Sequence, residues 1–94
     1  MVNALRLHPQ DSVVVALSDL PAGTRLVWAD MDENITVTTL RPIPFGHKVA
    51  IAPIRRGEAV IKYGAPIGLA TEDIVPGDHV HVHNLRSVRG AAQR

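Results

Sequence analysis

The stretch Gly46-His47-Lys48-Val49-Ala50-Ile51 contains the pattern on which the fold is built: a glycine, two mostly polar residues and then an apolar run. Three other segments repeat it, namely Gly23-Thr-Arg-Leu-Val27, Gly57-Glu-Ala-Val-Ile61 and Gly77-Asp-His-Val-His-Val82. Glycine reaches positive φ without steric cost, and a β-branched apolar run fits a pleated strand. Each copy is therefore predicted to be a turn that opens a strand. The uneven spacing of the copies argues against a solenoid with one fixed repeat.

The composition also favours a small domain made of strands. The chain has 94 residues, of which 24 are Val, Ile or Thr and only three are aromatic. These β-branched side chains favour strands over helices, and seven Gly with seven Pro interrupt the chain too often for long helices. We therefore expect one all-β domain of short twisted strands and hairpins, with at most single helical turns.

Further segments complete the expected architecture. Residues 13–17 are predicted to form a strand, and residues 26–29 and 35–40 to form a hairpin around a polar turn. Residues 70–74 are predicted to hold a single helical turn that Thr71 caps. The domain is expected to span residues 1–86, with a C-terminal tail at 87–94.

Charge and composition argue against several classes of partner. Ten Lys and Arg against nine Asp and Glu give a net charge of +1, which supplies no large field for nucleic acid. The absence of cysteine excludes a disulfide framework and a thiolate site. We find neither a secretory signal pattern nor 18 consecutive apolar residues. The sequence therefore predicts a soluble cytoplasmic protein that binds neither nucleic acid nor a membrane.

The most informative segment for chemistry is Asp78-His79-Val80-His81-Val82-His83-Asn84. If it is a strand, its period of two places the three histidines on one face and the two valines on the other. Neighbouring imidazoles on one face could reach a single transition-metal ion. One alternative is that the histidines only occupy the solvent-facing side of an edge strand whose valines lie in the core, and another is that the histidines themselves belong to the core.

Four other side chains are candidates for substrate or proton chemistry. His47 and Lys48 follow a turn glycine, where an imidazole can exchange a proton and an ammonium can hold a carboxylate. Asp11 precedes the first expected strand, where it could instead cap a turn. Lys62 lies at a strand end beside Tyr63, which we interpret as half-buried packing rather than a catalytic acid.

Four segments, taken together and in this order, strongly resemble the altronate dehydratase family: HPQDSVVVALSDLPAGT (8–24), GHKVAIAPI (46–54), GEAVIKYGAPIGLA (57–70) and DIVPGDHVHVHN (73–84). The similarity covers roughly residues 5–86 and is to the small subunit or N-terminal domain of these enzymes, known as a SAF domain with a β-clip fold. Sister members of the family include galactarate dehydratase and the small subunit of sulfolactate sulfo-lyase. The HVHVHN segment (79–84) favours the altronate branch.

The resemblance implies one component of a hydro-lyase that removes water from a sugar acid to give a 2-keto-3-deoxy acid. Members of the family commonly use a divalent metal such as iron or manganese, and their main catalytic region is a much larger domain or a separate large subunit. The partners implied are that large catalytic subunit and a sugar-acid substrate, and a homo-oligomer stays open. We expect the isolated chain to be inactive, with the metal bound only in the complete enzyme.

The positions that match the family's motifs receive inferred roles. The matching residues are His8, Asp11, Gly46, His47, Lys48, Lys62, Tyr63, Gly64, His79, His81, His83 and Asn84. Among them we expect catalytic groups at His47 and His81, substrate-binding groups at Lys48, Asp11 and Lys62, and metal ligands at His79, His81 and His83. Two alternatives are a non-catalytic assembly or lid module of a related lyase, and a free-standing module that binds sugar acids.

Overall fold

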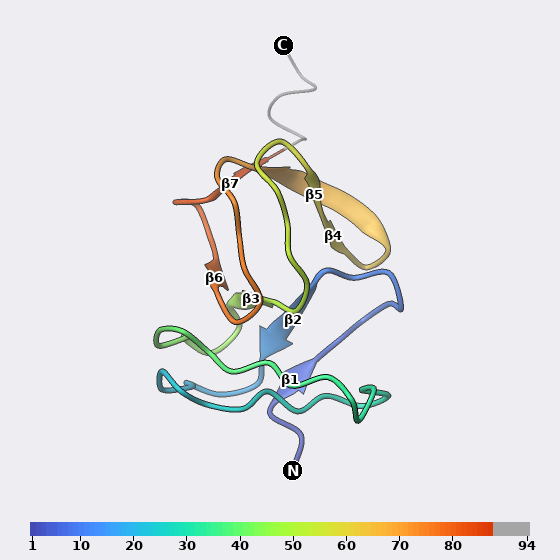
Figure 1. Cartoon of the computed structure of the whole chain (residues 1–94), viewed down its shortest axis with the longest axis vertical. Coiled ribbons are helices and arrows are strands. Elements are labelled where there is room, and N and C mark those ends of the chain that lie inside the picture. The colour runs from blue at the N-terminus through green and yellow to red at the C-terminus, as the bar shows by residue number, and fades with distance from the viewer. Residues whose placement is uncertain (88–94) are drawn as a thin grey trace.

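The computed structural model describes residues 1–87, and these fold into seven short strands (Figure 1). The strands are β1 (Ala4–Leu5), β2 (Val13–Ala16), β3 (Lys48–Ala50), β4 (Ala59–Lys62), β5 (Ala65–Ala70), β6 (His79–Val80) and β7 (Leu85–Ser87). The described residues contain no helix, and therefore none that could cross a membrane. The prediction of a small all-β domain is confirmed. Most of the predicted tail, residues 88–94, lies outside the described residues.

The strands form two antiparallel sheets. The first has the order β1-β2-β3-β6 and the second the order β4-β5-β7. In Figure 1 the second sheet lies at the top of the view, and the long connection between β2 and β3 lies at the bottom. The chain crosses from the first sheet to the second between β6 and β7, so this crossing brings the histidine-rich segment between the sheets.

Two hydrophobic cores lie on opposite faces of the β2–β3 pair. Val14 and Val49 are directly paired and belong to one core, with Leu26, Trp28 and Ile43. The adjacent pair, Val13 and Ala50, belongs to the other core, which the second sheet covers. Successive strand residues point to opposite faces, and here both faces are buried. The uninterrupted apolar run at the start of β2 follows from this position.

The four turn glycines adopt the positive φ that the sequence predicts, but only three of them open a strand. Gly23, Gly46, Gly57 and Gly77 all have positive φ, between 80° and 94°. Three of these turns lead into β3, β4 and β6. The turn at Gly23 leads only to an isolated bridge between Arg25 and Thr38.

Two local predictions need correction. The expected hairpin of residues 26–29 and 35–40 is an irregular antiparallel pair, joined by that bridge and by a bond from the Leu26 N–H to the Val37 carbonyl. The expected helical turn at residues 70–74 is wrong, because Ile74 instead exchanges two backbone hydrogen bonds with Ile54. Thr71, predicted to cap that turn, donates its N–H to the Asn84 carbonyl. Long-range pairing thus takes the backbone groups that a local turn needs.

Replacement of Gly77 by Ala should destabilise the domain far more than replacement of Gly57. A Cβ at Gly77 would lie 2.1 Å from the Thr38 carbonyl oxygen, whereas a Cβ at Gly57 meets nothing within 4 Å. Both positions carry the conformational penalty of positive φ, on the order of 1–2 kcal/mol. Only Gly77→Ala adds a clash with backbone, so we expect it to cost at least about 3 kcal/mol in urea unfolding. Equal losses in the two variants would contradict this account.

Candidate functional site

The segment from His79 to Asn84 turns where the sequence predicts a continued strand. β6 ends at Val80, and residues 81–84 form a bend and a turn, closed by a bond from the Asn84 N–H to the His81 carbonyl. Val80 is fully buried, but Val82 is 82% exposed. The expectation that both valines anchor the same core is therefore wrong for Val82, because the pleat does not continue beyond Val80.

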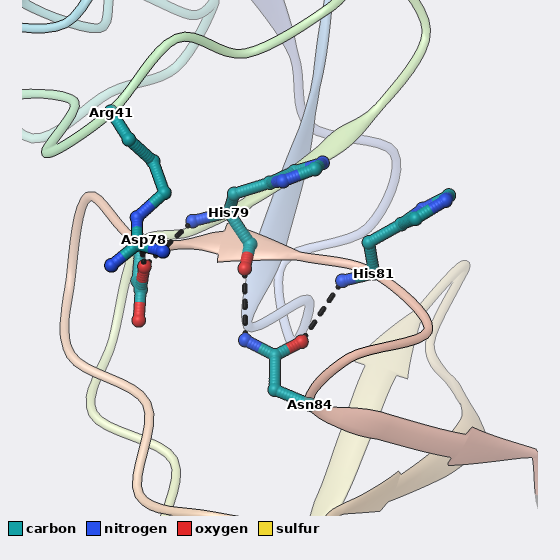
Figure 2. Close-up of polar contacts among 5 residues, drawn as sticks. All are labelled: Arg41, Asp78, His79, His81 and Asn84. Carbon is teal, nitrogen blue, oxygen red and sulfur yellow. Dashed lines mark hydrogen bonds and ion pairs between the residues drawn. The ribbon is translucent and has the colours of Figure 1, made fainter.

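Asn84 holds this turn in shape from inside (Figure 2). Its side chain is fully buried, its Oδ1 accepts the His81 N–H at 2.9 Å, and its Nδ2 donates to the His79 carbonyl at 2.9 Å. The backbone on both sides of Val80 is thereby tied to one amide group. This clamp keeps the rings of His79 and His81 on the same side of the segment, nearly parallel at 10° and with centroids 5.3 Å apart.

His47 joins these two histidines from the neighbouring strand. Because β3 pairs with β6, the residue before β3 lies beside the histidines. Its Nδ1 is 2.9 Å from the His79 Nε2, and its ring stacks on that of His81 with centroids 4.5 Å apart. The three residues offer ring nitrogens that all lie within 4.8 Å of one another. Three convergent imidazoles suit a divalent transition metal, whose bonds to nitrogen are about 2.1 Å long.

The electrostatic surroundings keep His79 ready to act as a ligand. Burial, followed by the neighbouring imidazoles of His47, His81 and His83, lowers the pKa of His79 to about 4, although the Asp78 carboxylate opposes the shift. His79 is therefore neutral at pH 7. Partial burial and the nearby His47 also lower the pKa of His81. Neutral imidazoles hold a free lone pair, which a metal needs.

Lys48 adds positive charge beside the histidine cluster formed by His47, His79 and His81, and Lys62 in turn acts electrostatically on Lys48. Lys48 directly follows His47, and its ammonium contributes to the lowered pKa of His81. Burial, followed by the Lys62 ammonium, lowers the pKa of Lys48 itself. Mutual influence of this kind requires the charges to be near one another. A carboxylate-bearing ligand would relieve this repulsion.

The other predicted site residues lie differently. The His83 ring is tilted at 5.5 Å from the His79 ring, and His83 is not among the three convergent ligands. Asp11 is buried, and its carboxylate accepts the N–H groups of Gly64 and Leu7. Substrate binding by Asp11 stays a prediction, and these contacts supply a structural role for the residue instead.

The sequence identifies His47 and Asn84 as positions that match the family, but it predicts none of the contacts that they make. The sequence suggests an acid–base role for His47, separate from the metal ligands, because pairing between β3 and β6 is not visible in the sequence. Asn84 received no role, although an Asn directly after alternating histidines is a signal for a turn. A further contact also went unrecognised: Asp78 Oδ1 accepts the His79 N–H and lies 3.3 Å from the Arg41 Nε (Figure 2).

Fold and site together define a small two-sheet β domain that presents an open cluster of imidazoles at its surface. The family model described as the altronate/galactarate dehydratase SAF domain matches residues 2–88. The chain belongs to this family, as the resemblance in the sequence implies.

Relatives fall into two groups by length. The chain is 46% identical over 83 residues to an altronate dehydratase of Escherichia coli K12, and 37% identical over 87 residues to one of Bacillus subtilis. The matches cover 88% and 93% of this chain but only 16% and 17% of those proteins. A (2R)-sulfolactate sulfo-lyase subunit alpha of Chromohalobacter salexigens is 38% identical over 87 residues, 88% of this chain and 93% of that subunit. The relatives are thus dehydratases and a lyase subunit by name, and this chain spans less than a fifth of the dehydratases.

Asn84→Ala should loosen the histidine cluster as well as the fold. The variant leaves the His81 N–H and the His79 carbonyl without partners, at about 1–3 kcal/mol each. Asn3→Ala is a matched control, because Asn3 Oδ1 accepts the Val27 N–H and its Nδ2 donates to the Arg25 carbonyl, away from the histidines. Both variants should lower the free energy of unfolding. Only Asn84→Ala should shift the imidazole NMR signals of His79 and His81. Unchanged signals would show that the two Asn84 hydrogen bonds do not position these rings.

Proposed function

We propose that this chain is the SAF component of a metal-dependent sugar-acid dehydratase and works with a large catalytic chain. The observation that carries the proposal is the convergence of the ring nitrogens of His47, His79 and His81 within 4.8 Å. The positive charge of Lys48, which acts on His81, and of Lys62, which acts on Lys48, suits an acid substrate. Membership of the dehydratase SAF family supports the reaction class, and the 46% identity to an altronate dehydratase favours an altronate-like substrate. The expected compartment remains the cytoplasm.

The proposed reaction has two bond-breaking steps. A base removes the proton from the carbon next to the carboxylate, and the β-hydroxyl takes up a proton and leaves as water. The resulting enol becomes the 2-keto-3-deoxy acid. The ammonium groups of Lys48 and Lys62 would hold the substrate carboxylate. A bound divalent metal, iron or manganese, would supply positive charge that stabilises the anion as the proton leaves.

The histidines cannot hold a metal and move a proton with the same nitrogen. A ring nitrogen that donates its lone pair to a metal has no lone pair left for a proton. We therefore assign the metal to His47, His79 and His81, and proton transfer to a group outside these three. His83 is the nearest imidazole outside them, since its ring lies 5.5 Å from that of His79. The large chain would supply the remaining ligands and groups.

Metal titration of the assembled enzyme distinguishes the proposed metal ligands from the histidine outside them, His83. His79→Ala removes the ring that contacts all the others, so metal should no longer bind tightly and turnover of altronate should fall by about a hundredfold or more. His83→Ala is the matched control and should retain the metal. Calorimetry with Mn²⁺, together with the rate of 2-keto acid formation, measures both effects. Retention of tight Mn²⁺ binding by His79→Ala, or its loss in His83→Ala, would overturn the ligand assignment.

A second candidate function is a non-catalytic assembly or lid module of a related lyase. The observation that favours it is the match to 93% of a sulfolactate sulfo-lyase subunit alpha. In this case the histidines would be contacts with the large chain. Absence of metal binding, both in the isolated chain and in the assembled enzyme, would favour this function over the first.

Docking of the large chain should involve Val82. This side chain is 82% exposed in the turn between two histidines, where a partner that completes the metal site would cover it. Val82→Asp should weaken association with the large chain by at least about tenfold, because a charge would be buried without a partner. Leu5→Asp is the control, since Leu5 is exposed on β1, at the opposite edge of the first sheet from β6. Analytical ultracentrifugation measures the association. Equal weakening by both variants would refute docking of the large chain at Val82.

A further inference from the structure

The second sheet carries a pocket of about 240 Å³ that shares no residue with the histidine cluster. The residues that line it are Arg56, Gly57, Leu69, Ala70, Thr71 and Arg86. They come from the turn before β4, from the end of β5 and from β7. Pockets for drug-sized ligands measure roughly 300–1,000 Å³, so this pocket suits a smaller molecule.

The strand register places the pocket on the outer face of the second sheet. Ala70 pairs with Leu85, and both pack in the second core. Leu69 pairs with Arg86, and successive strand residues point to opposite faces, so these two side chains point away from that core. Side chains directly opposite each other in an antiparallel pair are in contact range. Leu69 therefore supports the aliphatic stem of Arg86 beside the pocket.

Long-range hydrogen bonds fix the backbone around the pocket. The Gly57 N–H donates to the Ala70 carbonyl at 2.8 Å, which holds the turn with Arg56 against the end of β5. The Thr71 N–H donates to the Asn84 carbonyl at 2.9 Å, directly before β7. A Cβ at Gly57 would meet nothing within 4 Å, so the space above the turn is open. The pocket is thus present before any ligand arrives.

The two arginines of the pocket have no acidic partner within residues 1–87. Both side chains are exposed, and neither guanidinium forms an ion pair or a hydrogen bond with another residue in this range. Two nearby carboxylates already accept backbone N–H groups: Glu58 accepts that of Arg55 at 2.7 Å, and Asp73 accepts that of Arg56 at 2.9 Å. The planar donor fork of a guanidinium matches a carboxylate with two parallel hydrogen bonds. Arg56 and Arg86 therefore offer two such forks at one pocket.

We propose that this pocket binds a small organic di-acid, with one carboxylate on the guanidinium of Arg56 and the other on that of Arg86. The Thr71 hydroxyl can donate a further hydrogen bond to the ligand. The apolar side chains of Leu69 and Ala70 suit the hydrocarbon chain between two carboxylates, whereas a compact phosphate ion has no apolar part to place there. The site lies outside the histidine cluster, so this inference does not depend on the proposed function.

Titration of the 94-residue chain with succinate, followed by NMR at constant ionic strength, tests the site. The Nε–H signals of Arg56 and Arg86 should shift together, with a dissociation constant of about 1 mM or below. Butyrate has the same number of carbons but one carboxylate, so it leaves one guanidinium without a partner. It should bind at least about tenfold more weakly than succinate.

Three glutamine variants separate the pocket from a general effect of positive charge. Arg56→Gln and Arg86→Gln should each weaken succinate binding about tenfold or more, because each removes one of the two forks. Arg55→Gln is the matched control, since it removes the same charge one residue away and Arg55 does not line the pocket. It should change the dissociation constant by less than about twofold, as expected for an exposed charge outside the site.

The thermal midpoints of the three variants should stay close to that of the wild type, because all three arginines are exposed. Four results would overturn the proposal. These are a wild type whose Arg56 and Arg86 signals do not respond to succinate, shifts confined to the histidine signals, equal weakening by Arg55→Gln, and tighter binding of inorganic phosphate than of succinate.

Discussion

The paired strands β2 and β3 are buried on both faces, and their register positions the other parts of the domain. Val14 and Val49 point into one core, and Val13 and Ala50 point into the other. A change in register by one residue would exchange these side chains between the cores and would move every residue attached to the two strands. The same pairing places His47 directly before β3, at the end of the strand that β6 joins. The position of the imidazoles is thus a consequence of core packing.

The arrangement of the histidine rings depends on the turn between β6 and β7, where the chain passes from the first sheet to the second. A continued strand would space successive imidazoles roughly 6.5–7 Å apart along one line. The buried amide of Asn84 ends the strand after Val80, and the rings of His79 and His81 approach to 5.3 Å between centroids. His47 then stacks on this pair from β3. One edge strand and one turn therefore create a convergent set of nitrogens that a straight strand does not provide.

Polar groups of the N-terminal segment connect the two sheets through hydrogen bonds to the β4–β5 hairpin. Asp11 binds the turn of the β4–β5 hairpin, and Ser12 binds Ile61 within β4. Buried carboxylates that accept backbone N–H groups commonly serve such a bracing role. The hairpin with Lys62 and Tyr63 is consequently held in a fixed relation to the first sheet. The exposed Val82 lies in the turn beside the cluster, where we propose that a large partner chain docks.

Much of the fold was predictable from local sequence patterns. The glycine at the head of each repeated motif has positive φ, and the β-branched run that follows Gly46 or Gly57 forms a strand, because both preferences are properties of single residues and their neighbours. The predictions for residues 26–40 and 70–74 were less accurate. In these segments the backbone bonds to distant partners such as Ile54, and such pairing has no local signature.

The amino-acid sequence alone identifies this chain as a small all-β domain of the dehydratase SAF family and singles out a histidine-rich segment as the candidate site. Residue types and their order are sufficient for these conclusions. Which imidazoles meet depends on the tertiary structure, since His47 is 32 residues from His79 in the chain and reaches it through strand pairing. The tertiary structure likewise makes Tyr63 exposed and strained rather than half-buried as expected, because burial and backbone conformation depend on what the whole chain packs against each residue.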